Sequence, residues 1–309
     1  MPERSSFELL NPDDRRDERR DWLAERKIPA ALGSHKEAAQ YFQPDPNLVD
    51  AVNVALAVGA PLLLTGEPGT GKTQVAHYLA WFFRVELFPL FVRSSTTDND
   101  LKYHFDAVAY LHAANDPERR SEKLDKSKFV RPGPLWLAYD EALEKKKPAV
   151  VLIDEIDKAP RDFPNDLLNV LDQHVFEVRE TGQTVSRGDN PPPVVVITSN
   201  SERRLPEPFL RRCLVHHLEL TKDLLQRAVI ARHGDFPDLA DAVRDQAIKR
   251  FWDLRDHELR KKPATAELLV WLFLLASRGI SPLELQGPLR SLPFIQALIK
   301  DRDDFSLLP

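Results

Sequence analysis

The chain has 309 residues, 42% hydrophobic and 29% charged, which is enough apolar character for a packed core and excludes a wholly disordered protein. Lys and Arg number 43 against 48 Asp and Glu, and the net charge of −5 does not support a generally basic, nucleic-acid-coating surface. The single cysteine, Cys213, excludes an intrachain disulfide and a cysteine-based zinc site. The longest apolar runs, 51–64 and 268–276, are shorter than the roughly 20 residues of a membrane span. With no signal-peptide core at the start, we expect a cytoplasmic protein of two domains.

Residues 1–35 form a charged leader, which is densest in Arg, Asp and Glu between Asp13 and Asp21. A mixed run of this kind is typical of a solvated helix or a poorly ordered segment. The alternative is an arm that clasps a neighbouring subunit.

Short apolar runs predict four strands, and apolar residues at helical spacing lie between them. Strands that alternate with helices are typical of a parallel sheet covered by helices on both faces. We therefore expect an α/β domain over residues 36–220. The expected strands are 61–65, 87–93, 149–153 and 194–198.

Helical patterns alone remain after Leu220, so we expect a small all-helical domain over 221–309. Gly234 and Gly279 suit helix ends, and the run from Ser281 to Glu284 is typical of a capping box with proline at the first helical position. The expected helices are 221–233, 239–255, 265–277 and 282–300, the last interrupted around Pro288 and Pro293.

Two long excursions interrupt the α/β pattern. One lies between Phe91 and Ala149, and the other, at 176–190, is a predicted hairpin with Thr181 and Gly182 in its turn. Long segments inside a compact domain are commonly functional, so we expect both to engage a partner. The alternative is that they are loops that only pack on the rest of the chain.

The run from Gly66 to Thr73 (GEPGTGKT) matches the pattern G-x-x-x-x-G-K-[ST] and lies between a predicted strand and a predicted helix. Glycines let the backbone turn its N–H groups inward, which forms an anion nest at a helix N-terminus. Lys72 is expected to reach the β- and γ-phosphates of a nucleotide, and the Thr73 hydroxyl to bind Mg²⁺. A glycine-rich turn without a ligand is the alternative. The predicted nucleotide-binding residues are Gly66, Glu67, Pro68, Gly69, Thr70, Gly71, Lys72, Thr73 and Gln74.

A pair of acids, Asp154 and Glu155, follows the apolar strand 149–153. Two adjacent carboxylates at the end of a buried strand need compensation, and a magnesium nucleotide would provide it. Asp154 is expected to hold Mg²⁺ together with Thr73, and Glu155 to orient and polarise the attacking water. A solvated acidic pair would be the favoured alternative without the phosphate loop.

The phosphate loop, together with residues 152–160 (LIDEIDKAP), resembles the AAA+ ATPases and, among them, the MoxR-like branch. The resemblance covers about residues 41–280 and includes the further segments 44–50, 105–109 and 131–136. It implies a P-loop NTPase fold with a helical lid domain, and ATP or ADP with Mg²⁺ as cofactors. The first excursion resembles the helix-2 insert of that branch, and the second resembles its insert before sensor 1.

The same resemblance assigns roles to three polar residues. Asn200, at the end of the run 194–200, matches sensor 1, which contacts the γ-phosphate and the lytic water; otherwise it is an ordinary turn former. Arg211 and Arg212 match the segment that supplies the arginine finger to the next subunit, and the sequence does not decide between them. A guanidinium group there would neutralise charge on the transferring phosphoryl group. The alternative is a basic face paired with acidic neighbours.

One position departs from the family pattern. Glu267 stands near the place where MoxR-like proteins usually carry the sensor 2 arginine. Lys261 or Lys262 could contact phosphate instead, although charged residues before a proline-led helix mostly contact solvent.

We therefore expect an ATP-hydrolysing ring motor, hexameric by resemblance, that remodels a protein partner in a chaperone-like role. The resemblance also implies a von Willebrand factor A domain protein as a partner. One alternative is a nucleotide-gated switch or scaffold with slow turnover, which the unusual Glu267 motivates. A nucleic-acid-associated NTPase is a further alternative, which the net acidity disfavours. No membrane partner is expected.

Overall fold

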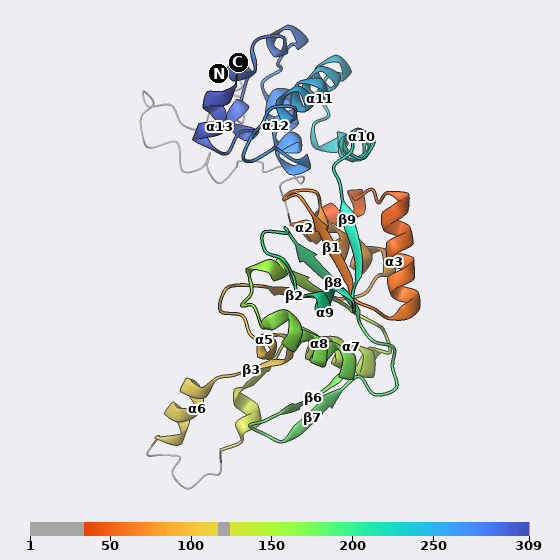
Figure 1. The fold of residues 1–309 in the computed structure, drawn as a ribbon, viewed down its shortest axis with the longest axis vertical. Helices are drawn as coiled ribbons and strands as arrows, with labels where there is room; N and C mark the ends of the chain where they lie inside the picture. Colours follow the sequence, from red (N-terminus) through yellow and green to blue (C-terminus); the bar gives the residue numbers. More distant parts are fainter. Residues whose placement is uncertain (1–33, 117–123, 309) are drawn as a thin grey trace, which may run out of the picture. The chain divides into compact units, whose positions relative to one another are not determined.

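The computed structural model describes residues 34–116 and 124–308. The predicted leader therefore lies almost entirely outside the described residues. Contacts within the chain group it into two compact units (Figure 1). An α/β unit holds residues 44–67 and 72–219, and a helical unit holds the residues from Leu220 onward together with 68–71 and the described residues before Pro44.

The α/β unit is built on a five-stranded sheet in the order β2–β5–β8–β1–β9, with every neighbouring pair parallel. Four strands match those expected from the sequence. The apolar patterns do not predict β9, because this edge strand alternates in burial and carries His216 and His217, so it lacks the continuous apolar run of a central strand. The strands are β1 (Leu62–Gly66), β2 (Leu87–Phe91), β5 (Val150–Asp154), β8 (Val194–Ser199) and β9 (Leu214–Leu218).

Helices cover both faces of this sheet. Every residue of β5 is buried, and its Val151 and Ile153 share a core cluster with Leu135 of α7 and Leu167 of α8. Since alternate residues of a strand point to opposite faces, the remaining residues of β5 face the other side, where α4 packs. The unit is therefore a parallel sheet between helical layers. Its helices and 3₁₀ turns are α3 (Pro46–Val58), α4 (Lys72–Phe83), α5 (Asp98–Lys102), α6 (Ala107–Ala114), η4 (Lys126–Phe129), α7 (Pro134–Lys145), η5 (Ile156–Lys158), α8 (Phe163–Gln173) and α9 (Glu207–Leu210).

The two excursions form small antiparallel ribbons. In the first, β3 (Tyr103–Phe105) pairs with β4 (Val130–Pro132), and in the second, β6 (Val175–Val178) pairs with β7 (Gln183–Ser186), as the hairpin prediction requires. The two ribbons meet at Tyr103, whose ring lies 6.5 Å from that of Phe176 and whose hydroxyl accepts a hydrogen bond from the Arg179 N–H at 3.2 Å.

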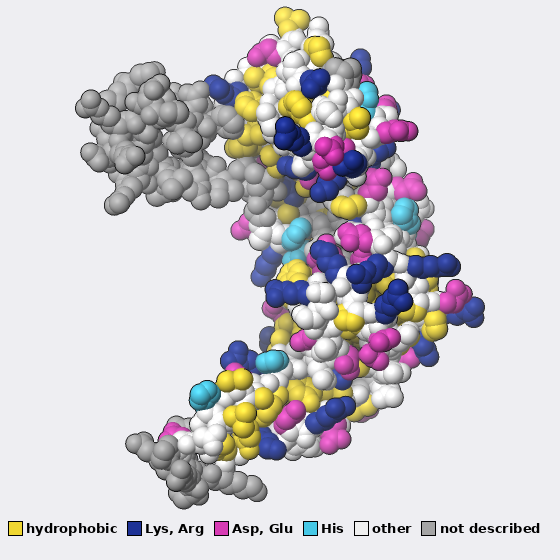
Figure 2. Space-filling view, turned by 60° about the vertical axis from the view of Figure 1, so that its left-hand side comes forward, with side chains coloured by type: hydrophobic (Ala, Val, Ile, Leu, Met, Phe, Trp, Pro, Cys, Tyr) yellow, Lys and Arg dark blue, Asp and Glu magenta, His cyan; other side chains and the backbone are white. Residues whose placement is uncertain are grey.

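Helix α6 of the first excursion has no buried residue. Its Val108 and Leu111 are 66% and 57% exposed, and hydrophobic side chains lie open at this end of the α/β unit (Figure 2).

The helical unit packs around a second core that includes Phe251, Trp271 and Leu272. Three of the expected helices form close to their expected bounds, and Gly279, with φ 59°, follows the end of α12 as expected. Gly234 does not end a helix; it lies inside a 3₁₀ turn. The elements are α2 (His35–Ala38), η2 (Ala39–Tyr41), α10 (Lys222–Ala231), η6 (His233–Asp235), α11 (Asp241–Arg255), α12 (Thr265–Ser277), η7 (Pro282–Leu285), η8 (Leu289–Ser291), η9 (Ile295–Ala297) and α13 (Arg302–Leu307).

The helix expected over 282–300 does not form as an α-helix, whereas its interruption around Pro288 and Pro293 is confirmed. Three separate 3₁₀ turns occupy this stretch, because each of Pro288 and Pro293 removes a backbone donor and blocks the preceding turn. The capping box at its start does form, with the Ser281 N–H and hydroxyl both donating to Glu284 Oε2 at 2.8 Å. Within the described residues, no helix combines the length and the apolar character needed to cross a membrane.

Candidate functional site

The phosphate loop connects β1 to α4, the strand and helix between which the sequence pattern places it. Gly66, Gly69 and Gly71 have φ angles of 141°, 78° and 94°. Residues with a Cβ atom rarely adopt these angles, so the loop needs glycine at all three positions. Backbone flexibility at these positions allows the chain to curl around an anion at the start of α4.

Lys72, the first residue of α4, is 6% exposed. Its Nζ donates hydrogen bonds to the carbonyl oxygens of Gly66 and Glu67, each at 2.8 Å. Burial lowers the pKa of Lys72, and the nearby carboxylates of Asp157, Asp154 and Glu155 oppose that shift. The ammonium group is thus held at the loop by two neutral acceptors, which phosphate oxygens can replace as stronger, charged acceptors.

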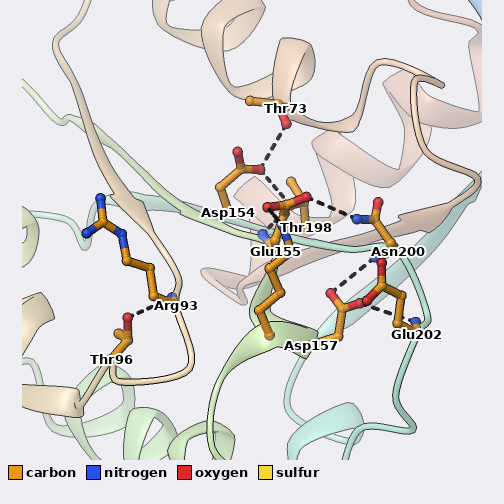
Figure 3. Close-up of polar contacts among 10 residues, drawn as sticks. Thr73, Arg93, Thr96, Asp154, Glu155, Asp157, Thr198, Asn200 and Glu202 are labelled. Atoms are coloured by element: carbon orange, nitrogen blue, oxygen red, sulfur yellow. Dashed lines mark hydrogen bonds and ion pairs between the residues drawn. The ribbon is translucent and has the colours of Figure 1, made fainter. Parts of the chain in front are cut away.

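A chain of hydrogen bonds joins α4 to the ends of β5 and β8 (Figure 3). Both the Thr73 hydroxyl, at 2.9 Å, and the Thr198 hydroxyl, at 2.7 Å, donate to Asp154 Oδ1. Thr198 Oγ1 also accepts from the Glu155 N–H at 2.8 Å. Thr73 and Asp154 are therefore adjacent, and their hydroxyl and carboxylate oxygens are the hard donors that Mg²⁺ prefers. Sequence reasoning does not single out Thr198, whose role depends on the pairing of β5 with β8.

Glu155 lies just beyond β5 with φ 60° and ψ 53°, a left-handed conformation that is uncommon for this residue type. Asn200 Nδ2 donates to its Oε1 at 3.1 Å (Figure 3). The ammonium group of Lys158 forms an ion pair with its other oxygen, Oε2. The structure thus brings together two of the predicted site residues, Glu155 and Asn200, and adds Lys158, to which the sequence gives no role.

Asp157 ties the segment after β8 to the end of β5. Its carboxylate is buried and accepts from the backbone N–H groups of Asn200 and Glu202, each at 3.2 Å (Figure 3). These bonds hold Asn200 beside Glu155. No spacing rule in the sequence identifies Asp157, because its partners lie more than forty residues away.

The remaining residues of the predicted phosphate loop differ in exposure. Thr70 is buried, Glu67 and Pro68 are exposed, and Gln74 is half-buried on α4. Ser199, beside Asn200, is buried and accepts a hydrogen bond from the Ser201 N–H at 3.0 Å.

The two candidate finger arginines do not join the hydrogen-bond network of Glu155 and Asn200. Arg211, 76% exposed, pairs with Glu207 one turn earlier at 3.1 Å. Arg212 pairs with Asp172 of α8 at 3.2 Å, with both side chains about half exposed. Such exposed pairs contribute little and break readily, so either guanidinium is available to another acceptor.

Within the helical unit, the candidates for sensor 2 have structural partners. Glu267 Oε2 accepts from the Ala264 N–H at 3.1 Å and so caps the start of α12. The backbone N–H of Lys261 donates to Asp304 at 3.0 Å, and the side chains of Lys261 and Lys262 are exposed. The glutamate at position 267 is therefore explained by its hydrogen bond to the N-terminus of α12, where an acidic side chain is stabilising.

Comparison with known proteins adds to this geometry. Residues 61–213 match the family described as the AAA domain (dynein-related subfamily). The chain is 31% identical over 147 residues to chaperone protein ClpB of Gloeobacter violaceus, a stretch that covers 46% of this chain and 14% of ClpB. It is 24% identical over 236 residues to the uncharacterized protein YehL of Escherichia coli K12, covering 70% of this chain and 59% of YehL. A solved structure from Cytophaga hutchinsonii overlaps 83% of both chains at 12% identity, with a TM-score of 0.41.

The chain spans less than two thirds of the length of either curated relative. The family match supports a nucleotide-binding domain of the P-loop type over residues 61–213, and the structure there has a parallel sheet between helices.

Proposed function

We propose that this protein, which carries an AAA domain over residues 61–213, hydrolyses ATP to ADP and phosphate in order to act on a protein partner. The observation that carries the proposal is the network of Thr73, Asp154 and Thr198 beside the pair of Glu155 and Asn200. It supplies oxygen donors for a metal ion and, next to them, a carboxylate able to accept a proton from water.

Each residue of the network has a separate role in this proposal. The backbone of the loop and Lys72 bind the phosphates, while Thr73 and Asp154 hold Mg²⁺. The bound ion would neutralise the charge that develops on the phosphoryl oxygens. Glu155 orients the attacking water and accepts its proton, and Asn200 holds the Glu155 carboxylate in place.

We propose further that the working form is a ring, hexameric as the resemblance to the MoxR-like branch implies, with Arg211 or Arg212 completing the site of the next subunit. The similarity to a protein named as a chaperone supports remodelling of a protein partner. A von Willebrand factor A domain protein is the partner class that the branch implies. The exposed apolar residues of α6 support a contact with such a partner through the first excursion.

A nucleotide-gated switch with slow turnover is the second candidate. Two observations favour it: Glu267 caps α12 where the family pattern has an arginine, and Lys158 occupies one oxygen of Glu155. Both candidates require nucleotide binding, and they differ in the rate of hydrolysis. Binding of nucleic acid is the least favoured candidate, given the net charge of −5.

Phosphate release by wild type, Lys72→Ala and Glu155→Gln, combined with binding of a fluorescent ATP analogue, tests the proposal. Lys72→Ala should lose binding, because the buried ammonium group is removed from the loop. Glu155→Gln should keep binding and lose a factor of about 10²–10⁴ in turnover, the usual contribution of a general base.

Turnover that is equal in wild type and Glu155→Gln would contradict hydrolysis and leave the switch as the function. Wild-type affinity in Lys72→Ala would contradict the assignment of the phosphate loop.

A further inference from the structure

Both oxygens of the Glu155 carboxylate have a partner in the structure. Oε1 accepts from the amide of Asn200 at 3.1 Å, and Oε2 forms an ion pair with the Lys158 ammonium group. The two partners differ in kind. Asn200 is a neutral donor held by Asp157, whereas Lys158 brings a full positive charge on a flexible side chain.

The local backbone places Lys158 over Glu155. The left-handed conformation of Glu155 leads directly into the 3₁₀ turn η5, and the Lys158 N–H donates to the Glu155 carbonyl oxygen at 3.0 Å. This hydrogen bond closes a turn between residues 155 and 158, and the two side chains meet across it in an ion pair. The Lys158 and Glu155 side chains remain 44% and 38% exposed, so the pair can open without unpacking the core.

We propose that Lys158 is a positioning residue that restrains Glu155 and thereby slows hydrolysis, an inference that rests on the proposed ATPase function. A carboxylate that accepts a proton from water needs an oxygen free to bond to that water. The Lys158 ammonium group competes for Oε2, so Glu155 must exchange this partner before it acts on water. Asn200 stays on Oε1 and sets the direction of the carboxylate throughout.

The expected effect is modest, because an exposed ion pair is worth at most about 1 kcal/mol, which corresponds to about fivefold in rate. Lys158→Met should therefore raise kcat for ATP hydrolysis by about two- to fivefold. The KM for ATP should change little, because the Lys158 ammonium group pairs with Glu155 and not with the phosphate loop that binds the nucleotide. Lys158→Arg should restore the wild-type rate, since it keeps the charge and a donor.

Lys145→Met is a matched control. Lys145 also forms an ion pair with an acid one turn earlier, Glu141 on α7, at 2.8 Å, and this pair lies outside the network of Glu155. It should leave kcat unchanged. A kcat for Lys158→Met that is equal to or below that of wild type would overturn the proposal.

A second measurement does not depend on turnover. In thermal unfolding without nucleotide, Lys158→Met should lower the Tm of the wild-type background by more than it changes the Tm of the Glu155→Gln background, because only in the first does it remove an ion pair with a charged carboxylate at position 155. Equal shifts in both backgrounds would mean that the pair does not form and would overturn the proposal.

The two measurements also separate this inference from the proposed function. A wild type that hydrolyses no ATP contradicts the ATPase proposal and, with it, any restraint on hydrolysis, whatever the Tm values are. A wild type that hydrolyses ATP, with a Lys158→Met variant no faster, contradicts the role of Lys158 alone.

Discussion

The buried hydroxyl of Thr198 connects the two acids at the end of β5. It donates to Asp154 Oδ1 and accepts from the Glu155 N–H, so one side chain orients both the carboxylate proposed to hold Mg²⁺ and the backbone of the proposed general base. Its side chain is almost fully buried, which removes water as a substitute partner. The hydroxyl is therefore expected to matter for both stability and turnover.

Replacing Thr198 by Val keeps the shape of the side chain and removes both hydrogen bonds. The unsatisfied Glu155 N–H should lower the free energy of unfolding by about 1–3 kcal/mol. Turnover should fall more than nucleotide affinity, because the loop and Lys72 are unchanged. Urea denaturation and phosphate release measure the two effects. Thr198→Ser keeps the hydroxyl and should resemble wild type; a loss in Thr198→Ser equal to that in Thr198→Val would mean that the methyl group, not the hydroxyl, is what counts.

At the scale of elements, the segment before α12 depends on a residue far along the chain. The carboxylate of Asp304 on α13 is fully buried and accepts from the backbone N–H groups of Arg260 and Lys261, at 2.8 and 3.0 Å. These bonds satisfy a connection that has no regular secondary structure of its own. The short helix α13 thereby fixes the path of the chain into α12.

Asp304→Ala should therefore destabilise the helical unit. Each of the two backbone groups that lose their acceptor costs about 1–3 kcal/mol if it remains buried. Neighbouring Asp303 supplies the control, because its carboxylate forms an exposed ion pair with Arg260, so Asp303→Ala should stay within about 1 kcal/mol of wild type. Circular dichroism during urea denaturation compares the two variants. Equal stability of Asp304→Ala and Asp303→Ala would show that these backbone groups find other partners.

At the scale of the whole molecule, the proposed ring requires that an arginine of one subunit completes the nucleotide site of the next. Among the described residues, Arg211 and Arg212 pair with the exposed acids Glu207 and Asp172 and lie outside the network of Glu155. A guanidinium group that stabilises the transferring phosphoryl group is worth about 10³–10⁵ in rate. We therefore expect Arg211→Ala or Arg212→Ala to keep nucleotide affinity, and one of them to lose about 10³ in turnover.

Mixing two inactive proteins distinguishes an arginine that acts on its own subunit from one that acts on the next. The double variant Arg211→Ala, Arg212→Ala keeps an intact Glu155, and Glu155→Gln keeps both arginines. If the finger acts between subunits, the mixture should regain part of the wild-type phosphate release, and each variant alone should not. A mixture as inactive as its components would contradict the trans-acting finger and the ring that it requires.

The sequence by itself determined the parts of the protein whose chemistry is local. The phosphate loop needs glycines at positive φ, with a lysine and a threonine at a set spacing from them. The strand before Asp154 and Glu155 is predicted by its continuous apolar composition. Strands β1, β2, β5 and β8 and the three helices α10, α11 and α12 follow from periodicity in the same way. The sequence does not predict the edge strand β9, because its histidines interrupt the apolar run. It predicts the breaks at Pro288 and Pro293, but not that the pieces between them form 3₁₀ turns instead of α-helix.

Only the tertiary structure decided how the site is supported. Thr198 belongs to no predicted motif, and the family pattern over 152–160 gives Asp157 and Lys158 no role. Thr198 and Asp157 bind partners more than forty residues away, across strands that meet only in the folded sheet. The physical reason is that parallel pairing brings the carboxyl ends of β5 and β8 together. Sequence spacing predicts contacts between residues that are near each other along the chain, and these residues are not. Lys158 is close to its partner Glu155 in the sequence, yet its role depends on the left-handed conformation of Glu155. A glutamate at that position does not predict this conformation.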